Sequence, residues 1–334
     1  MDMMKSKKTR VAVIGAGGWG YQHARAFSNR EDTELCCIVG RTLERTRARA
    51  EQFKVNYYLD IDTMLEQEKP DLVSICMPGQ GTFEPTMKVI KAGFPLFVEK
   101  PLAYSLDEAR IMIEEARKRD LFFAIDFNHS CSEPVQRAKQ IIDSGQLGSI
   151  VFAQWRFAQS SDGIPITHPY MEQIEAQCHG LDLIEYLCGP IESLSADMTD
   201  IAGKNSYTTF SLSLHFKNQG VGTFLGSFDS SECYEFAQMI DVNGMKGRIL
   251  IEDNLKRCTY QKAGSQVAET WRPSMFDDDA NSFTHNLDRH LDRLIPAFRS
   301  GGRPPIPAER GLRALQLAYA AIESFQTGKR ITIE

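Results

Sequence analysis

Three glycines stand where a run of apolar residues gives way to a helical pattern. The segment that starts at residue 11 reads VAVIGAGGWGYQHARAF, so Gly15, Gly17 and Gly20 form a G-x-G-x-x-G spacing after a strand-like stretch. In a strand–helix–strand unit, such glycines permit a tight turn, a close approach of backbone to a pyrophosphate, and close packing of helix on strand. The free N–H groups that begin the helix also favour phosphate. We predict a dinucleotide site here; the alternative is a turn with a purely structural role.

The chain after the second expected strand bears on the choice of dinucleotide. An NAD-preferring site usually presents an acidic residue there to the ribose hydroxyls, whereas this chain reads Val39-Gly40-Arg41-Thr42. Arg41, Thr42 and Arg45 can instead hold a 2′-phosphate, because a guanidinium pairs well with phosphate. The sequence therefore favours NADP(H), and a change of Gly40 to Asp is expected to shift the preference toward NAD(H). NAD(H) remains possible, with Arg41 as a solvated charge.

A second set of residues has the spacing of one helical stripe. Glu175, His179 and Asp182 stand at i, i+4 and i+7, so a helix would bring them onto one side. A histidine that titrates near neutrality suits proton transfer. A polar stripe on an amphipathic helix is more often a solvated face, and the spacing alone leaves that alternative open.

The elements that must position these residues change character along the chain. Strand-like runs at residues 10–14, 34–39, 71–77, 96–98 and 122–127 alternate with expected helices at 21–28, 43–53, 83–92 and 105–119. This order predicts a parallel sheet with helices on both faces, within a Rossmann domain at residues 1–128. After a helix at 135–144, alternating runs such as VFAQWRFA and YTTFSLSLHF predict a largely antiparallel sheet in a second α+β domain at residues 129–334. Two helices, at 283–299 and 308–327, are expected near the end of the chain.

Composition excludes several classes of protein. The net charge of -6 argues against a nucleic-acid or anionic-membrane partner, because either would need a basic face. The chain shows neither a signal-peptide pattern nor about 18 consecutive apolar residues, the length that a membrane span requires. Its 8 cysteines contain no C-x-x-C pair, so we expect reduced thiols in a cytoplasmic protein.

Further motifs give the whole chain a resemblance to a known family. They are Ile75-Cys-Met-Pro78, Lys91-Ala-Gly93, Val98-Glu99-Lys100-Pro101-Leu102, Asp126-Phe-Asn128, Gly145-x-x-Gly148, and His179-x-x-Asp182 followed by Gly189. In this order and spacing they resemble the GFO/IDH/MocA family, which includes glucose-fructose oxidoreductase and inositol dehydrogenase.

The resemblance implies an oxidoreductase that uses NAD(P) on a hydroxyl-bearing carbon of a sugar, cyclitol (inositol-like) or related polyol. It also implies that Lys100 lies near the nicotinamide, often with a cis peptide bond to the following proline. His179 would be the acid or base, with Glu175 or Asp182 in support. From position alone, Lys100 could be a solvated charge, but it ends a parallel strand, where ligands bind in such sheets.

The residues expected to bind ligands form two sets. For the cofactor they are Gly15, Gly17, Gly18, Trp19, Gly20, Gly40, Arg41, Thr42, Arg45, Met77, Pro78, Thr82, Glu99 and Lys100. For the substrate they are Asn128, Arg156, His168, Tyr170 and Tyr234. A loop-capping role for His168, and a packing role for Arg156 and Tyr234, are the alternatives. No metal is expected.

Departures from the family pattern leave the substrate open. Thr82 stands where the family often has histidine, Glu175 where many members have aspartate, and His129-Ser130 where an arginine is common. Two other functions remain possible: a glycosidase that uses its cofactor in a transient oxidation, and a non-catalytic NAD(P)-binding sugar sensor. Strands such as VFAQWRFA carry apolar residues on both faces, so we also expect a homodimer or homotetramer joined through the C-terminal sheet.

Overall fold

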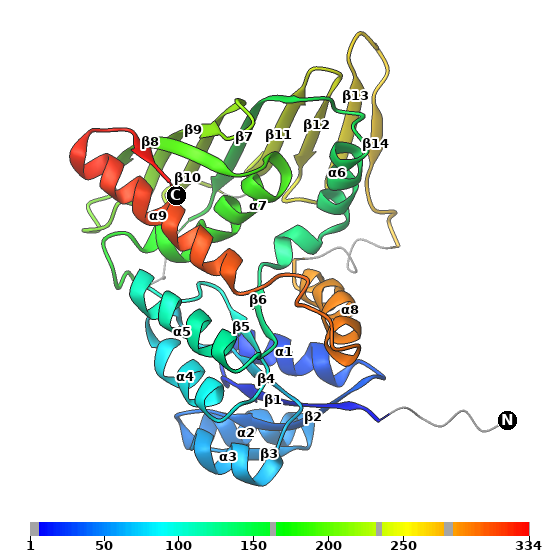
Figure 1. Cartoon of the computed structure of the whole chain (residues 1–334), viewed down its shortest axis with the longest axis vertical. Helices are drawn as coiled ribbons and strands as arrows, with labels where there is room; N and C mark the ends of the chain where they lie inside the picture. Colours follow the sequence, from blue (N-terminus) through cyan, green and yellow to red (C-terminus); the bar gives the residue numbers. More distant parts are fainter. Residues whose placement is uncertain (1–6, 161–164, 232–235, 277–282, 334) are drawn as a thin grey trace, which may run out of the picture. The chain divides into compact units, whose positions relative to one another are not determined.

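The computed structural model describes residues 7–160, 165–231, 236–276 and 283–333 (Figure 1). The chain forms two compact units. Unit 1 is Met1–Phe127 with Leu287–Leu312, and unit 2 is Asn128–Asn286 with Arg313–Glu334. The division expected at residue 128 lies next to the first of these boundaries. The second domain was expected to be continuous from residue 129 to 334. Unit 2 is instead interrupted, because most of helix α8 (His285–Arg299) belongs to unit 1. Its apolar residues Leu287, Leu291, Leu294 and Ile295 are part of the buried core of unit 1.

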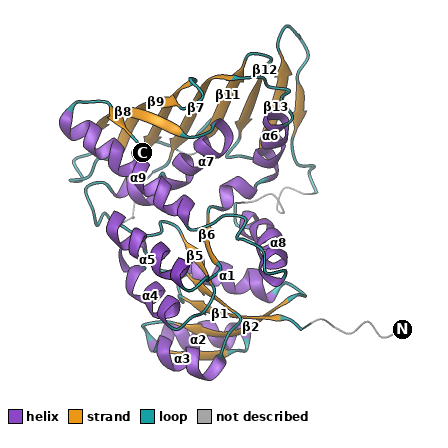
Figure 2. Ribbon diagram, viewed as in Figure 1, coloured by secondary structure: helices purple, strands orange, loops and turns teal. Residues whose placement is uncertain are grey.

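Unit 1 is built on a six-stranded sheet in the order β3-β2-β1-β4-β5-β6 (labelled in Figure 1; strands in orange in Figure 2). All five strand pairs are parallel. The strands are β1 (Thr9–Ile14), β2 (Thr33–Val39), β3 (Asn56–Tyr58), β4 (Leu72–Ile75), β5 (Leu96–Glu99) and β6 (Phe123–Asp126). The order reverses between β1 and β4, and ligands of such sheets bind outside the carboxyl ends of the strands at that switch point. The expected Rossmann architecture is thus confirmed.

In the described residues before 128, unit 1 has five α-helices, and all but α3 follow the sequence patterns closely. They are α1 (Gly18–Ser28), α2 (Leu43–Phe53), α3 (Ile61–Glu68), α4 (Phe83–Lys91) and α5 (Leu106–Lys118). The expected cap of α5 is present, because the Ser105 side chain accepts from the N–H groups of Asp107 and Glu108. Strand β3 and helix α3 were not predicted: β3 is short and largely exposed, so it lacks the apolar run by which the other strands were recognised.

Unit 2 is built on a nine-stranded sheet in the order β14-β13-β12-β11-β7-β10-β9-β8-β15. The pair β7–β10 is parallel and the other pairs are antiparallel, as expected for a mostly antiparallel sheet. The strands are β7 (Ile150–Ala158), β8 (Ile191–Thr199), β9 (Thr209–Phe216), β10 (Val221–Ser227), β11 (Gln238–Gly244), β12 (Gly247–Glu252), β13 (Arg257–Lys262), β14 (Glu269–Trp271) and β15 (Ile331–Thr332).

One face of this sheet is covered by helices of the same unit. Helices α6 (Glu133–Asp143), α7 (Cys178–Cys188) and the part of α9 (Glu309–Thr327) from Arg313 on lie on that side (Figure 1). Trp155 of β7 packs against Gly180 of α7, where an added Cβ would lie 2.6 Å from the indole. On the other face, Phe152, Val221 and Leu225 are exposed. Among the described residues, no helix combines the length and apolar character needed to cross a membrane.

Cysteine chemistry in the described part of the chain agrees with the expectation of reduced thiols. The seven cysteines there, Cys36, Cys37, Cys76, Cys131, Cys178, Cys188 and Cys258, are all free. Cys233 lies outside the described residues.

Candidate active site

The glycine turn between β1 and α1 has the three properties that a pyrophosphate site requires. Gly15 has φ +132°, and a Cβ there would meet the carbonyl oxygen of Cys76 at 2.4 Å. A Cβ on Gly20 would lie 1.9 Å from the Gly15 carbonyl oxygen, so helix and strand meet at backbone distance. Gly17 and Gly18 have no atom within 4 Å of an added Cβ. The N-terminus of α1 therefore opens onto free space, into which its N–H groups can bind phosphate.

A cavity of about 180 Å³ continues from this turn to the end of β2. Eight residues expected to bind the cofactor line it: Gly15, Gly17, Gly40, Arg41, Thr42, Arg45, Met77 and Pro78. Ala16, Thr46 and Cys76 also line it and were not predicted, since their types carry no binding signal of their own. Arg41 and Arg45 are exposed at its rim, with side chains able to reach a ligand.

Gly40 has a packing role that the sequence did not reveal. An added Cβ would lie 2.2 Å from Thr46 Oγ1 and 3.2 Å from the Ala16 Cβ. Thr46 Oγ1 also donates to the Thr42 carbonyl, which fixes the start of α2. The change of Gly40 to Asp would therefore disturb the cavity wall, and it is the wrong test of cofactor preference.

The other six residues expected to bind the cofactor are not among those that line this cavity. Gly18 and Trp19 lie in the first turn of α1, where Trp19 is 37% exposed. Thr82 is buried and donates to the Pro78 carbonyl, so its hydroxyl is occupied with holding the turn before α4.

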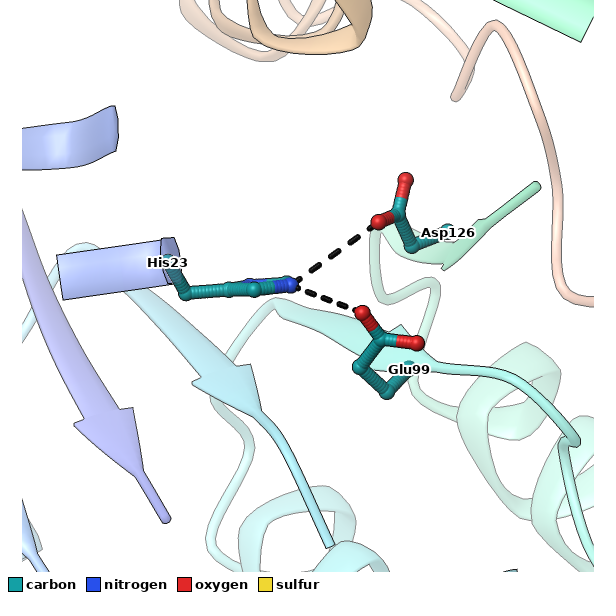
Figure 3. Close-up of side chains that lie close together, drawn as sticks. All are labelled: His23, Glu99 and Asp126. Atoms are coloured by element: carbon teal, nitrogen blue, oxygen red, sulfur yellow. Dashed lines mark hydrogen bonds and ion pairs between the residues drawn. The ribbon is translucent and has the colours of Figure 1, made fainter. Parts of the chain in front are cut away.

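Glu99 departs furthest from the prediction of a cofactor contact, because its carboxylate is turned into the protein. One oxygen lies 3.0 Å from His23 Nε2, and the other accepts from the Lys100 N–H. Figure 3 shows His23 on α1 directed toward Glu99 on β5 and Asp126 on β6. His23 Nδ1 lies 2.8 Å from Ser74 Oγ, so this buried network joins α1 to strands β4, β5 and β6.

The network extends to α8 through a buried histidine. His290 Nδ1 lies 2.7 Å from Asp126 Oδ1, and burial lowers the pKa of His290 to about 3. The neutral ring must therefore donate its Nδ1 proton to the carboxylate. His23, Glu99 and Asp126 have the composition of a metal-ligand set, with ligand atoms within 4.8 Å of one another. Because both ring nitrogens of His23 have hydrogen-bond partners, we interpret the cluster as a structural network.

His23 and His290 were not among the residues predicted from the sequence. A signal for His23 was present, because it stands three residues after Gly20 among the buried residues of α1. A polar side chain on the buried side of a helix needs a partner.

Lys100 follows the last residue of β5, at the carboxyl end of a parallel strand. Its peptide bond to Pro101 is cis, as the family resemblance implied. The Glu99 carboxylate accepts from its backbone N–H, which fixes the main chain from which the lysine side chain extends.

In unit 2, His179 and Asp182 lie on α7 and are buried, with 7% and 6% of their surfaces exposed. The interpretation as a solvated face is therefore wrong for these two residues. Glu175 lies outside α7, on the π-helical turn η3 (Glu172–Ala176). A π-helical turn holds more residues than an α-helical one, so the simple i, i+4 stripe does not extend back to Glu175.

A second imidazole lies directly against His179. His129, on the 3-10 turn η2 (Asn128–Cys131), stacks on it with ring centroids 4.0 Å apart and planes inclined by 6°. His129 is itself buried, and Gln238 Nε2 lies 3.4 Å from its Nδ1. Asn128, expected to contact substrate, is buried on the same turn.

The remaining substrate candidates are dispersed within unit 2. His168 Nδ1 accepts from the Tyr170 N–H, which is the loop-capping role given as its alternative. The Tyr170 hydroxyl accepts from Gln326 Nε2, and its ring stacks on Tyr207. Arg156 pairs in register with Leu225, so strand alternation places it on the sheet face opposite Trp155 and α7. This position does not support Arg156 as a partner of His179. Tyr234 lies outside the described residues.

Comparisons with known proteins identify the chain over nearly its whole length. Residues 9–127 match the model "Oxidoreductase family, NAD-binding Rossmann fold", and residues 135–250 match the GFO/IDH/MocA C-terminal domain. A Myo-inositol 2-dehydrogenase of Thermotoga maritima is 27% identical, over 97% of this chain and 98% of that protein. A D-glucoside 3-dehydrogenase of Escherichia coli is 27% identical, over 99% of each.

The fold is also similar to that of solved dehydrogenases. The structure of levoglucosan dehydrogenase in complex with NADH and levoglucosan has a TM-score of 0.88 at 17% identity, and the match covers 98% of this chain and 100% of that one. With the glycine turn, the cavity beside it and the two matched domains in order along the chain, this protein belongs to the GFO/IDH/MocA family of NAD-binding oxidoreductases.

Proposed function

We propose that the protein is an NAD(P)-dependent dehydrogenase or reductase that acts on a ring hydroxyl of a sugar, cyclitol or related polyol. The observation that carries the proposal is the full-length match to two dehydrogenases whose names specify a cyclitol and a glycoside hydroxyl. The His179-x-x-Asp182 pair supports the proposal, because both side chains are buried. On a helix face that serves only to contact water, they would be exposed.

Each residue has one task in the proposed reaction. The nicotinamide, when bound, accepts or returns the hydride. His179 takes the hydroxyl proton during oxidation and returns it during reduction. Glu175 or Asp182 stabilises the charge that the imidazole gains, and Lys100 polarises the substrate oxygen.

A substrate screen tests the reaction and the residues together. Polyols, sugars, cyclitols and glycosides are incubated with NAD and NADP, and the reduced nicotinamide is read by absorbance. Loss of a general base commonly reduces turnover by about 10² to 10⁴. We expect His179→Ala to show such a loss and Lys100→Met a lower turnover, while His179→Ala keeps the parent's cofactor affinity.

Three outcomes would contradict this function. Release of an aglycone without net cofactor reduction would indicate the glycosidase reaction. Tight sugar binding without turnover on any substrate would indicate a sensor. Turnover of His179→Ala within about threefold of the parent would remove the histidine from the proton step.

We further propose that NADP(H) is preferred over NAD(H). Arg41 and Arg45 line the cavity at the end of β2 together with Thr42, and no acidic residue is among the residues lining it. Two guanidinium groups there favour a 2′-phosphate, whereas a preference for NAD usually relies on a carboxylate.

The assembly we propose is a homodimer or homotetramer formed through the open face of the unit 2 sheet. Phe152, Val221 and Leu225 are 44%, 45% and 38% exposed there, on neighbouring strands of one face. Burial of such a patch against a second copy would remove apolar surface from water. Multi-angle light scattering at micromolar concentration that gives a mass near 37.7 kDa alone would contradict it.

A further inference from the structure

The stacked imidazoles of His129 and His179 form an arrangement that the proposed proton transfer leaves unexplained. The rings are nearly parallel at 4.0 Å, come from residues fifty positions apart in the chain, and are both buried. Phe283 meets His129 edge-on, with centroids 5.1 Å apart. The His129 ring is therefore held between Phe283, Gln238 and His179 and has little freedom to turn away.

We propose that His129 is a positioning residue for His179, and that the stacked pair carries a single proton across the working pH range. This proposal rests on the proposed function, in which His179 is the base. A neutral ring stacked on His179 fixes its plane and presents a π face to the cation that forms when it takes a proton. Two imidazolium groups at this distance would repel each other strongly, so a second proton enters only at more acidic pH.

The hydrogen bond between Gln238 and His129 also favours the neutral form of the His129 ring. The amide nitrogen of Gln238 is a donor, and it faces His129 Nδ1 at 3.4 Å. A neutral ring can accept this weak bond, whereas a doubly protonated ring would present a donor to a donor. The proton of the pair is thereby directed to His179.

Charged groups of both signs lie on the elements around the stacked pair. In unit 2 the elements packed against it carry Glu133, Arg137, Lys139 and Asp143 on α6, Arg156 on β7, Glu172 and Glu175 on η3, Asp182 and Glu185 on α7, Asp241 on β11, and His285 on α8.

Most of these groups interact elsewhere. Ion pairs join Glu133 to Arg137, Lys139 to Asp143, Asp241 to Arg248 and Glu185 to Arg313. Glu172 accepts from Gln177, and Arg156 lies on the far face of the sheet. Asp182, three residues after His179 on α7, and Glu175, on the preceding π-helical turn η3, are carboxylates of this region and favour a first proton on the pair. The repulsion between two stacked imidazolium rings opposes the binding of a second proton.

The test is a titration of the histidine rings by NMR in the protein without substrate, together with steady-state kinetics. Signals of ¹⁵N-labelled imidazoles are assigned with His129 and His179 variants. His215→Ala is the control, because His215 is exposed on the sheet face opposite α7 and should leave the His179 signal unchanged. We expect the pair to titrate in two steps separated by at least about one pH unit. In His129→Phe the more acidic step should be absent.

Kinetics separate positioning from a merely structural role. His129→Ala should lower kcat at least about tenfold with little change in KM for the cofactor, because the base loses its fixed plane while the phosphate site is untouched. His129→Phe, which restores a flat ring, should recover most of that turnover. Thermal melting of both variants checks that they fold.

Two results would overturn the proposal: rings that titrate independently at one midpoint in the parent, or a His129→Phe turnover as low as that of His129→Ala. Because the titration needs no substrate, it can fail or succeed whether or not His179 is the base. Parent-like turnover in His179→Ala would instead refute the proposed function and leave the titration result standing.

Discussion

The glycines of the β1–α1 turn differ in what surrounds them, and alanine at each should give a different result. At Gly20, an added Cβ would lie 1.9 Å from the carbonyl oxygen and 2.6 Å from the carbonyl carbon of Gly15. Both atoms are backbone, so the helix must move away from the strand. Overpacking of this kind costs about 1–3 kcal/mol or more. For a domain of about 150 residues, each kcal/mol lowers the melting temperature by about 2–4 °C, so Gly20→Ala should melt about 2–12 °C below the parent.

Gly17 and Gly18 supply the matched comparisons, because neither has an atom within 4 Å of an added Cβ. Gly18→Ala lies in the first turn of α1 and should melt at or slightly above the parent temperature. Gly17→Ala, at the N-cap, should cost no more than about 1 kcal/mol in stability. Its methyl group would occupy the space through which the backbone approaches a pyrophosphate. We therefore expect at least a tenfold loss of dinucleotide affinity, equivalent to about 1.4 kcal/mol.

The assay combines circular-dichroism melting without cofactor with fluorescence titration of NADH and NADPH. Parent-like melting of Gly20→Ala would refute the argument that helix and strand meet at backbone distance. Parent-like affinity of Gly17→Ala would refute the placement of the pyrophosphate at this turn, whatever its stability.

The other predictions concern cofactor choice and the pH dependence of stability. Arg41→Ala should weaken NADPH binding about tenfold or more, since a hydrogen bond to a charged group contributes about 1.5–3 kcal/mol. The affinity for NADH should stay within about threefold of the parent's. Equal losses of affinity for both cofactors, or tighter binding of NADH than of NADPH by the parent, would contradict the proposed preference. Burial lowers the pKa of His290 to about 3. As the pH falls below about 6.5, the histidine therefore binds a proton in the unfolded chain but stays neutral in the folded protein. This contribution to the free energy of unfolding is present above pH about 6.5 and is lost as the pH falls toward 3, with a slope of up to about 1.4 kcal/mol per pH unit. His290→Asn, which keeps a donor for Asp126, should reduce that slope in urea unfolding between pH 7 and 4; an unchanged slope would exclude His290 as its source.

Patterns confined to neighbouring residues were sufficient for most of the fold. The start of α5 at its Ser105 cap, the bounds of α2, and the Rossmann unit around the glycine turn could all be predicted. In each case the controlling interaction joins residues within a few positions, such as a side chain capping its own helix.

Interactions between distant residues lay beyond such patterns. The return of α8 to unit 1 depends on how Leu287 and Leu291 fit a core formed by the first part of the chain. The inward turn of Glu99 depends on His23, and part of the crowding at Gly40 comes from Ala16 in the β1–α1 turn.

The sequence by itself determined the family, the dinucleotide turn and the residue types available for proton transfer, because these depend on local spacing and on motif order along the chain. Tertiary structure alone decided that His129 stacks on His179, and that Glu175 lies on a π-helical turn just before α7. The physical reason is that a ring stack or an inserted residue in a helix is selected by packing against other elements, and local spacing carries no record of that packing.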